Sequence, residues 1–263
     1  MTNKMQRTKY SFKAKSSFGL LFSGVILFNI TWLALSFLLQ NKALPSPIDV
    51  YKAMPKISSE GMIHHSIASF ERVVWGTSIS LIIALIVGTI TGLNKKASTI
   101  INPLLYLSYP IPKLALLPII MITFGIGEAT KVIMIILIIV FQLIISVRDS
   151  IRNINKENFY VLTSLRATKM QYIQHVVFPG ILPDILSALR VTIGIATSVL
   201  FVTETFGTDK GLGFFIVDAW MRIDYISMYA GIVMISVIGF ILFLIIDIVD
   251  AIFCKWNKIR TGN

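Results

Sequence analysis

The sequence predicts an all-α membrane protein with about six transmembrane helices, and three observations lead to this fold class. Of the 263 residues, 55% are hydrophobic and only 14% are charged, which is more apolar than a soluble domain usually tolerates. The apolar residues form six runs of roughly the 20 residues that cross a bilayer. The basic residues gather at the ends of these runs, so the net charge of +11 indicates membrane orientation and not nucleic-acid binding.

The first apolar run, 18–39, follows a basic segment, 1–17. It is longer than a signal-peptide core and no Ala-x-Ala-like cleavage site follows it, so we expect an uncleaved first span. The other five predicted spans are 73–93, 101–124, 129–147, 191–206 and 225–251.

The third run contains Pro103, Pro110, Pro112 and Pro118, each of which removes a backbone donor and favours a kink or a break. Broken backbone in a bilayer must be satisfied by protein or by a wet cavity. We therefore expect this span to face the interior of the bundle.

Six spans place both termini on one side of the membrane, and the distribution of Lys and Arg selects the side. With a cytoplasmic N-terminus, Arg72 and Lys113 lie near or within spans, and sixteen of the 24 basic residues are cytoplasmic. The remaining six are external: Lys42, Lys52, Lys56, Lys131, Lys210 and Arg222. The chain, 1–263, is predicted to be a single domain, because no segment outside the membrane is long enough to bury a core of its own.

The sequence does not predict an enzyme, a metal site or a cofactor site. It has no Gly-x-x-x-x-Gly-Lys-Ser/Thr phosphate loop, so energy from a nucleotide must come from a partner. A lone cysteine, Cys254, excludes an internal disulfide. The neighbouring His64 and His65 lack a third ligand at a useful spacing.

A polar, basic loop at 148–190 separates two apolar runs. Apolar residues recur in it at spacings that favour short amphipathic helices. Pro179 and Pro183 are expected to stop the helix and turn the chain back to the membrane. The segment is either a helical knob presented to another protein or an amphipathic loop lying on its own bundle.

Three runs of this loop, Ser164-Leu165-x-Ala167-Thr168, the stretch 176–183 and Ala188-Leu189-Arg190, resemble the coupling motif of ABC importer permeases. The branch that serves nitrate, sulfonates and taurine is the most similar. Further runs at 44–47, 72–76, 110–118, 124–128 and 211–214 occur in the family's order, so the resemblance covers 44–256.

This resemblance implies a type I ABC importer permease in the cell membrane, multi-pass, with both termini cytoplasmic. It implies a cytoplasmic ABC ATPase dimer, a second permease that is identical or different, and an external solute-binding protein as partners. The solute would be nitrate, a sulfonate, taurine, bicarbonate or a vitamin precursor. The residues expected to couple to the ATPase are Ser164, Leu165, Arg166, Ala167, Thr168, Ile173, Pro179, Gly180 and Pro183.

The motif departs from the family pattern at two places. Tyr160-Val161-Leu162 stands where the family has Glu-Ala-Ala, and Arg166 stands where it has glycine. Glycine permits a positive φ or a close backbone approach, both of which arginine resists. Arg166 either pairs with an acidic residue of the ATPase or is an ordinary solvated arginine.

The predicted translocation path contains Pro112, Lys113, Pro118 and Glu204, because ionisable groups within a bilayer usually face the interior. Glu204 either pairs with Lys113, lines the route or lies at the headgroup level. Lys113 either attracts an anionic solute or snorkels to the interface.

Three other polar groups have simpler interpretations. Arg72 is expected to pair locally with Glu71 at the membrane interface. The loop 207–213 is predicted to be flexible, and the resemblance implies that it contacts the binding protein. The acidic Asp247 and Asp250 are expected to form a charged exit with Lys255, Lys258 and Arg260.

Two other classes of function remain open from the sequence. One is a stand-alone secondary transporter or channel that uses Glu204 and Lys113 as an ion-coupling pair. The other is a scaffold that anchors partners to the bilayer. An importer needs an ATPase, a secondary transporter needs a gradient, and a scaffold transports nothing.

Overall fold

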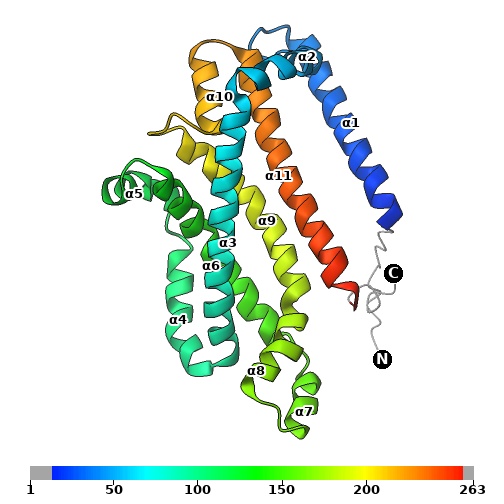
Figure 1. Ribbon diagram of the computed structural model, residues 1–263, viewed down its shortest axis with the longest axis vertical. Helices are drawn as coiled ribbons and strands as arrows, with labels where there is room; N and C mark the ends of the chain where they lie inside the picture. The colour runs from blue at the N-terminus through cyan, green and yellow to red at the C-terminus, as the bar shows by residue number, and fades with distance from the viewer. Residues whose placement is uncertain (1–13, 257–263) are drawn as a thin grey trace, which may run out of the picture.

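The computed structural model describes residues 14–256 and shows an elongated bundle of helices (Figure 1). No strand occurs within these residues. Lys258, Arg260 and most of the basic segment 1–17 lie outside the described range. The elements are α1 (Ala14–Leu39), α2 (Pro47–Ile57), η1 (Ser58–Met62), α3 (Ile63–Leu93), α4 (Lys95–Ser108), η2 (Lys113–Leu116), α5 (Leu117–Phe124), α6 (Glu128–Arg152), α7 (Lys156–Ser164), α8 (Lys169–Tyr172), η3 (Ile173–Val177), α9 (Phe178–Glu204), α10 (Leu212–Met221) and α11 (Tyr225–Phe253).

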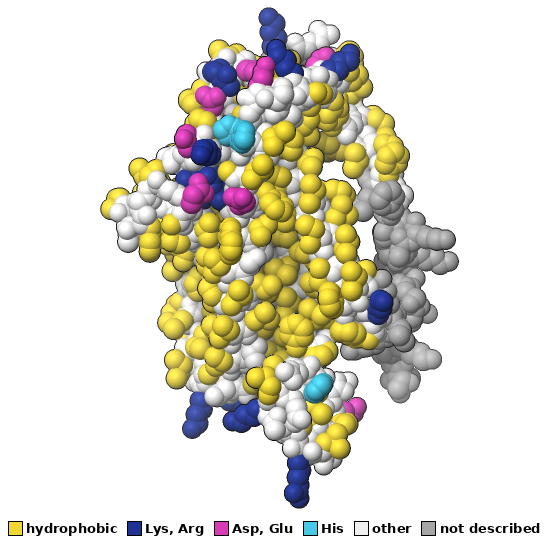
Figure 2. Space-filling view, viewed as in Figure 1, with side chains coloured by type: hydrophobic (Ala, Val, Ile, Leu, Met, Phe, Trp, Pro, Cys, Tyr) yellow, Lys and Arg dark blue, Asp and Glu magenta, His cyan; other side chains and the backbone are white. Residues whose placement is uncertain are grey.

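Five helical stretches of the described chain are long and apolar enough to cross a membrane, and one bent pair adds a sixth. The prediction of an all-α membrane protein with about six spans is therefore confirmed. One end of the bundle carries α2 and α10, and the other carries α7 and α8 (Figure 1). We call these the α10 end and the α7 end. On the face drawn in Figure 2, charged side chains gather mostly at the two ends, and the middle is apolar.

The centre of the bundle is α6, which packs against both α3 and α9. Met134, Ile135, Ile139, Leu143 and Val147 of α6 are fully buried. Glycines of α3 allow the close approach of the two helices. A Cβ atom added at Gly88 would lie 2.6 Å from Cβ of Val147, and one added at Gly76 would lie 2.6 Å from Cγ2 of Ile135.

Two predicted spans begin earlier than expected. The second starts at Ile63, ten residues before Val73. The fifth belongs to a continuous helical stretch, Lys169–Glu204. Arg148 and Arg152 lie within α6, and the residues 178–190 lie within α9, so the predicted loop 148–190 is reduced to 153–177.

The expectation that Pro179 and Pro183 stop the helix is wrong. Pro179 occupies the first turn of α9, and Pro183 lies inside that helix. A proline ring crowds the carbonyl group four residues earlier, which for Pro179 is that of His175. His175 belongs to the π-helical turn η3, and such turns absorb irregularities of the helical hydrogen-bond ladder.

The predicted break of the third span is confirmed, since α4 and the η2–α5 segment meet at an angle of 85°. Pro110 and Pro112 lie at the bend. The prediction that this span faces the interior is wrong for the single chain. Leu104, Leu107 and Ile122 are 62%, 68% and 86% exposed, because within this chain the span packs only on one side, mainly against α3 and α6.

The close contact between α3 and α6 gives a testable prediction. Gly88→Leu should lower the free energy of unfolding by about 1–3 kcal/mol, because the new side chain collides with Val147. Thermal unfolding of the purified chain in detergent measures this loss. Gly24→Leu in α1 is the matched control, because no atom lies within 4 Å of a Cβ added there. Equal midpoints for the two variants would contradict the tight packing of α3 on α6.

Candidate functional site

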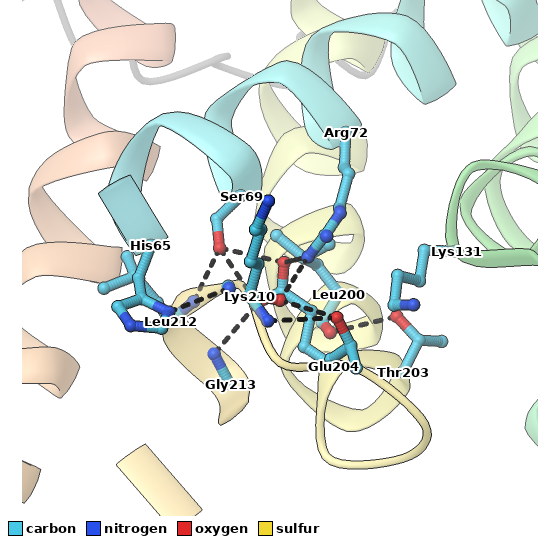
Figure 3. A network of polar contacts seen from close by, with 12 residues as sticks. His65, Ser69, Arg72, Lys131, Leu200, Thr203, Glu204, Lys210, Leu212 and Gly213 are labelled. Atoms are coloured by element: carbon cyan, nitrogen blue, oxygen red, sulfur yellow. Dashed lines mark hydrogen bonds and ion pairs between the residues drawn. The ribbon is translucent and has the colours of Figure 1, made fainter. Parts of the chain in front are cut away.

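A buried polar network lies near the α10 end and connects α3, α6, α9 and α10 (Figure 3). At its centre is Arg72 of α3, which is only 2% exposed. Its Nη1 atom donates to Oε1 of Glu204 at 2.6 Å. Its Nε and Nη2 atoms each donate to one carboxylate oxygen of Glu128 at 2.5 Å. The guanidinium group therefore bridges the end of α9 and the start of α6, and the contact with Glu128 is bidentate.

The Glu204 carboxylate is fully buried and accepts from two further donors. The Ser69 hydroxyl lies 2.9 Å from both carboxylate oxygens. The backbone N–H of Gly213 donates to Oε2 at 2.8 Å. Gly213 lies at the start of α10, where exposed N–H groups and the helix dipole favour a negative charge.

The loop between α9 and α10 is held by the same network. The carbonyl of Lys210 accepts from Arg72 at 2.9 Å, and the N–H of Leu212 donates to Ser69 at 2.8 Å. Nδ1 of His65 accepts from the N–H of Gly211 at 3.1 Å. The loop that the sequence predicts to be flexible is thus tied to α3 by three hydrogen bonds.

The sequence Gly211-Leu212-Gly213 is required by this packing. Gly211 has a φ of 120°, and a Cβ atom there would collide with the Glu204 carboxylate and lie 2.6 Å from Nη1 of Arg72. A Cβ atom at Gly213 would lie 2.5 Å from the Phe201 carbonyl oxygen and 2.7 Å from Cβ of Glu204. Both positions need glycine because the loop passes directly over the buried ion pair.

Two predicted ion pairs are wrong. Arg72 does not pair with Glu71, because α3 starts at Ile63 and places Arg72 on its buried face. Glu204 does not pair with Lys113, because Arg72 binds its carboxylate. The ammonium group of Lys113 instead donates to the Ser108 carbonyl at 2.8 Å.

A groove of about 680 Å³ lies between η2, α6 and α9. Pro112 and Lys113 line it from the break of the third span, and Gly194 and Ser198 line it from α9. The structure thus brings together two of the four residues predicted for the translocation path. Pro118 and Glu204 do not line this groove.

A second polar cluster fixes α4 near the α7 end. Nη1 of Arg148 donates to Oδ1 of Asn102 at 2.7 Å, and its guanidinium carbon lies 5.8 Å from the centre of the Tyr106 ring. Arg152 donates to the Ser98 hydroxyl. These contacts attach α4 to the final turns of α6.

The acidic pair of α11 also has a structural role. Oδ1 of Asp247 accepts from Nε of Arg190 at 2.6 Å, and Oδ2 of Asp250 accepts from Nη2 at 3.1 Å. Arg190 therefore joins α9 to α11 between two carboxylates.

The segment 156–177, which we call the coupling segment, forms the α7 end (Figure 1). The rings of Phe159 and Tyr172 stack at 6.2 Å, and the Tyr172 and Thr163 hydroxyls are 2.8 Å apart. Thr168 caps α8 by a reciprocal capping box with Gln171. These contacts hold α7 and α8 together as one unit.

Arg166 adopts the positive φ that the sequence argument reserves for glycine, with a value of 50°. The N–H of Ala167 donates to the Leu162 carbonyl at 3.0 Å, and the N–H of Arg166 donates to the Thr163 carbonyl at 3.0 Å. This is the Schellman pattern that ends many helices, with Arg166 at the position where glycine is preferred. The turn is retained despite the substitution, at a conformational cost.

The predicted coupling residues have different environments. Leu165 is 72% exposed, and the neighbouring Tyr160, Val161 and Met170 are 64%, 63% and 60% exposed. Ile173, Pro179 and Pro183 are half-buried against the bundle. The exposed members form an apolar surface at the α7 end, and the half-buried ones connect it to α9.

Residues 80–253 match the family model described as binding-protein-dependent transport system inner membrane component. The chain belongs to this family. The permease is 31% identical over 205 residues to the taurine transport system permease protein TauC of Escherichia coli (strain K12), covering 76% of this chain and 74% of TauC. It is 27% identical over 220 residues to the putative aliphatic sulfonates transport permease protein SsuC of Bacillus subtilis (strain 168), covering 83% and 80%.

A third relative, the bicarbonate transport system permease protein CmpB of Synechococcus elongatus, is 31% identical over 185 residues, covering 70% of this permease and 66% of CmpB. The predicted resemblance to ABC importer permeases, the type I permease fold and the multi-pass membrane location are confirmed.

The roles of Ser69, Glu128 and His65 in the network at the α10 end were not predicted from the sequence. No local sequence pattern indicates that these three side chains meet. The packing of α3 on α6 and α9 brings them together. One signal was present. Glycines spaced around Leu212 indicate a close backbone approach, and the approach is to Glu204.

Removing one side of the buried ion pair in this permease should be strongly destabilising. Arg72→Met leaves the Glu204 carboxylate buried without its counter-charge and should cost about 3–5 kcal/mol of unfolding free energy. The double variant Arg72→Met/Glu204→Leu should recover part of this loss, because it removes both charges. Thermal unfolding of the two variants tests the coupling, and a double variant less stable than the single one would contradict it.

The strained turn at Arg166 gives a separate prediction. Arg166→Gly should stabilise the turn by up to roughly 1 kcal/mol, because glycine adopts a positive φ without steric cost. Hydrogen exchange of the Ala167 amide should slow accordingly. Lys169→Gly, which lies within α8, is the control and should loosen the same segment. Faster exchange in Arg166→Gly would show that the arginine side chain stabilises the turn.

Proposed function

We propose that this permease is the membrane-spanning subunit of an ABC importer, with both termini and the coupling segment in the cytoplasm. Two copies, identical or paired with a different permease, would form the route for a small solute. An external binding protein would deliver the solute at the α10 end, and a cytoplasmic ATPase dimer would drive transport from the α7 end. The family membership supports this arrangement.

The observation that carries the proposal is the apolar surface of the coupling segment. Leu165 and Met170 are largely exposed beyond the last turns of the membrane-spanning helices α6 and α9. Exposed apolar groups outside a bilayer favour contact with another protein. The stacking of α7 on α8 makes this surface rigid, so that movement of a bound partner is transmitted to the bundle and not absorbed locally.

The names of the relatives support a choice of solute class. The proteins to which this chain is similar are named for the transport of taurine, aliphatic sulfonates and bicarbonate. We propose that this permease transports a small solute of that kind, and we include nitrate and vitamin precursors among the candidates.

The exposed face of the broken third span supports assembly with a second permease. Ile122 and Leu107 are apolar but 86% and 68% exposed in the described chain. A second permease would cover this face and place the break in the interior of the assembly, as its free backbone groups require.

A stand-alone secondary transporter is less well supported. That interpretation depended on an ion-coupling pair of Glu204 and Lys113, and Glu204 is bound to Arg72. That class does not account for the ordered apolar surface at the α7 end, whereas docking to an ATPase does, and the match to a transport-system family disfavours a scaffold.

Leu165→Glu should separate the importer from a stand-alone transporter. The tagged permease, purified from its native membrane in mild detergent, should bring down an ATPase. The substitution should lower this recovery by at least roughly tenfold, because a buried charge at an interface costs more than the 1.4 kcal/mol that a factor of ten represents. Met221→Glu, which places the same charge on a 67% exposed apolar residue at the α10 end, is the control and should retain the ATPase.

The melting temperature of both variants should match that of the wild-type protein, because the two side chains are exposed. Recovery of the permease without any ATPase, under several detergents and in the wild-type form, would overturn the proposed function.

A further inference from the structure

Three arginines of the membrane-spanning helices are neutralised by carboxylates of the same chain. Arg72 is paired with Glu128 and Glu204, Arg148 with Asp149, and Arg190 with Asp247 and Asp250. Lys113 has no ion-pair partner within residues 14–256. Lys131 and Arg152 also have none, but they lie in the first and last turns of α6.

The position of Lys113 follows from the break in the third span. In a continuous helix the Ser108 carbonyl would accept from the N–H of residue 112, but Pro112 has none. The Lys113 ammonium supplies that donor at 2.8 Å. It also lies 5.9 Å from the Tyr109 ring centre and 5.4 Å from the Phe141 ring centre, where the ring faces attract a cation.

These contacts leave the charge of Lys113 available. An ammonium group has three donors, and the Ser108 carbonyl occupies one of them. Among the residues that the structure describes, Lys113 is the single charged side chain that lines the groove of about 680 Å³. Ile138, Ile195 and Val199 supply much of the remaining wall, and Ser198 adds a hydroxyl group.

The groove also lies well inside the membrane-spanning region. Ile138 comes ten residues after the start of α6 at Glu128, which is about 15 Å along the helix. An unpaired cation at such a depth is costly, and in membrane proteins it usually marks a route for substrates or ions. The missing counter-charge is therefore the informative feature of this groove.

We propose that the groove between η2, α6 and α9 binds the anionic group of the transported solute, with Lys113 as its counter-charge. This proposal rests on the proposed import function and deepens it. Solutes that carry a sulfonate, carboxylate or other small oxyanion fit this groove, and cationic solutes are excluded. Gly194 leaves open space in the wall, because no atom lies within 4 Å of a Cβ added there.

The test uses thiol reagents of similar size and opposite charge, so that the natural solute need not be known. Ser198→Cys places a thiol in the wall of the groove. The full-length variant, in membrane vesicles, is treated with the sulfonatoethyl and the trimethylammonioethyl methanethiosulfonates. Mass spectrometry of the intact chain gives the two rates. Native Cys254 is only 2% exposed, and the wild-type protein measures its background.

The anionic reagent should react roughly tenfold faster than the cationic one, after correction for their rates with a free thiol, because the ammonium group lies in a low-dielectric wall. Lys113→Gln should remove this preference and Lys113→Arg should retain it. Lys96→Gln, which removes the same charge from an exposed lysine of α4, is the matched control and should leave the preference unchanged.

Equal rates for the two reagents, or a preference that survives Lys113→Gln, would overturn the proposal. Absence of reaction with either reagent would also overturn it, because the groove would then not be a wet route. A counter-charge supplied by a second permease would appear as equal rates in the assembled protein. Failure of the import function itself is seen separately, as absence of the ATPase from the purified wild-type protein.

Discussion

The contact between Arg72 and Glu204 is the interaction on which the α10 end of the molecule depends. Burying either charge alone would cost roughly several kcal/mol of folding free energy. The attraction between the two charges offsets this cost only when their remaining donors and acceptors are also hydrogen-bonded. Here Ser69, Gly213 and Glu128 complete the hydrogen bonds. The pair therefore determines three other features: glycine at positions 211 and 213, the start of α10 beside a carboxylate, and the approach of α6 to α3.

The helical stretch Lys169–Glu204 connects this network to the other end of the molecule. Its 36 residues extend over roughly 54 Å at the usual rise of an α-helix. One end emerges from the coupling segment, and the other ends at the buried Glu204. In the proposed importer, a displacement of the coupling segment by the ATPase would be transmitted along this helix to the Arg72–Glu204 ion pair at the α10 end. No loop interrupts this path, and the π-helical turn η3 is its one irregular point.

Sequence reasoning predicted the class of fold, the break at the prolines and the separate character of the coupling segment, because each depends on local composition. The predicted partners of Arg72 and Glu204 were wrong, because both side chains are paired across helices that are distant in the sequence. Arg72 has an acidic neighbour, Glu71, yet bonds to residues 56 and 132 positions away. Pro179 and Pro183 are helix breakers by local rules, but the first turn of α9 and the adjacent π turn accommodate them. Arg166 is a similar case, because the turn imposes a positive φ on a residue that disfavours it.

The break in the third span divides the molecule in a way that suits alternating access. Helix α4 is fixed to the α7 end by Arg148 and Arg152. Helix α5 belongs instead to the α10 end, where Met121 and Ile126 pack against the backbone of Gly207. Lys113 lies at the joint between these two halves. A change at either end would therefore alter the angle of the joint and the width of the groove beside it. In the proposed importer, the groove would be the place where both movements converge, and the charge of Lys113 would contact the solute whichever end is open.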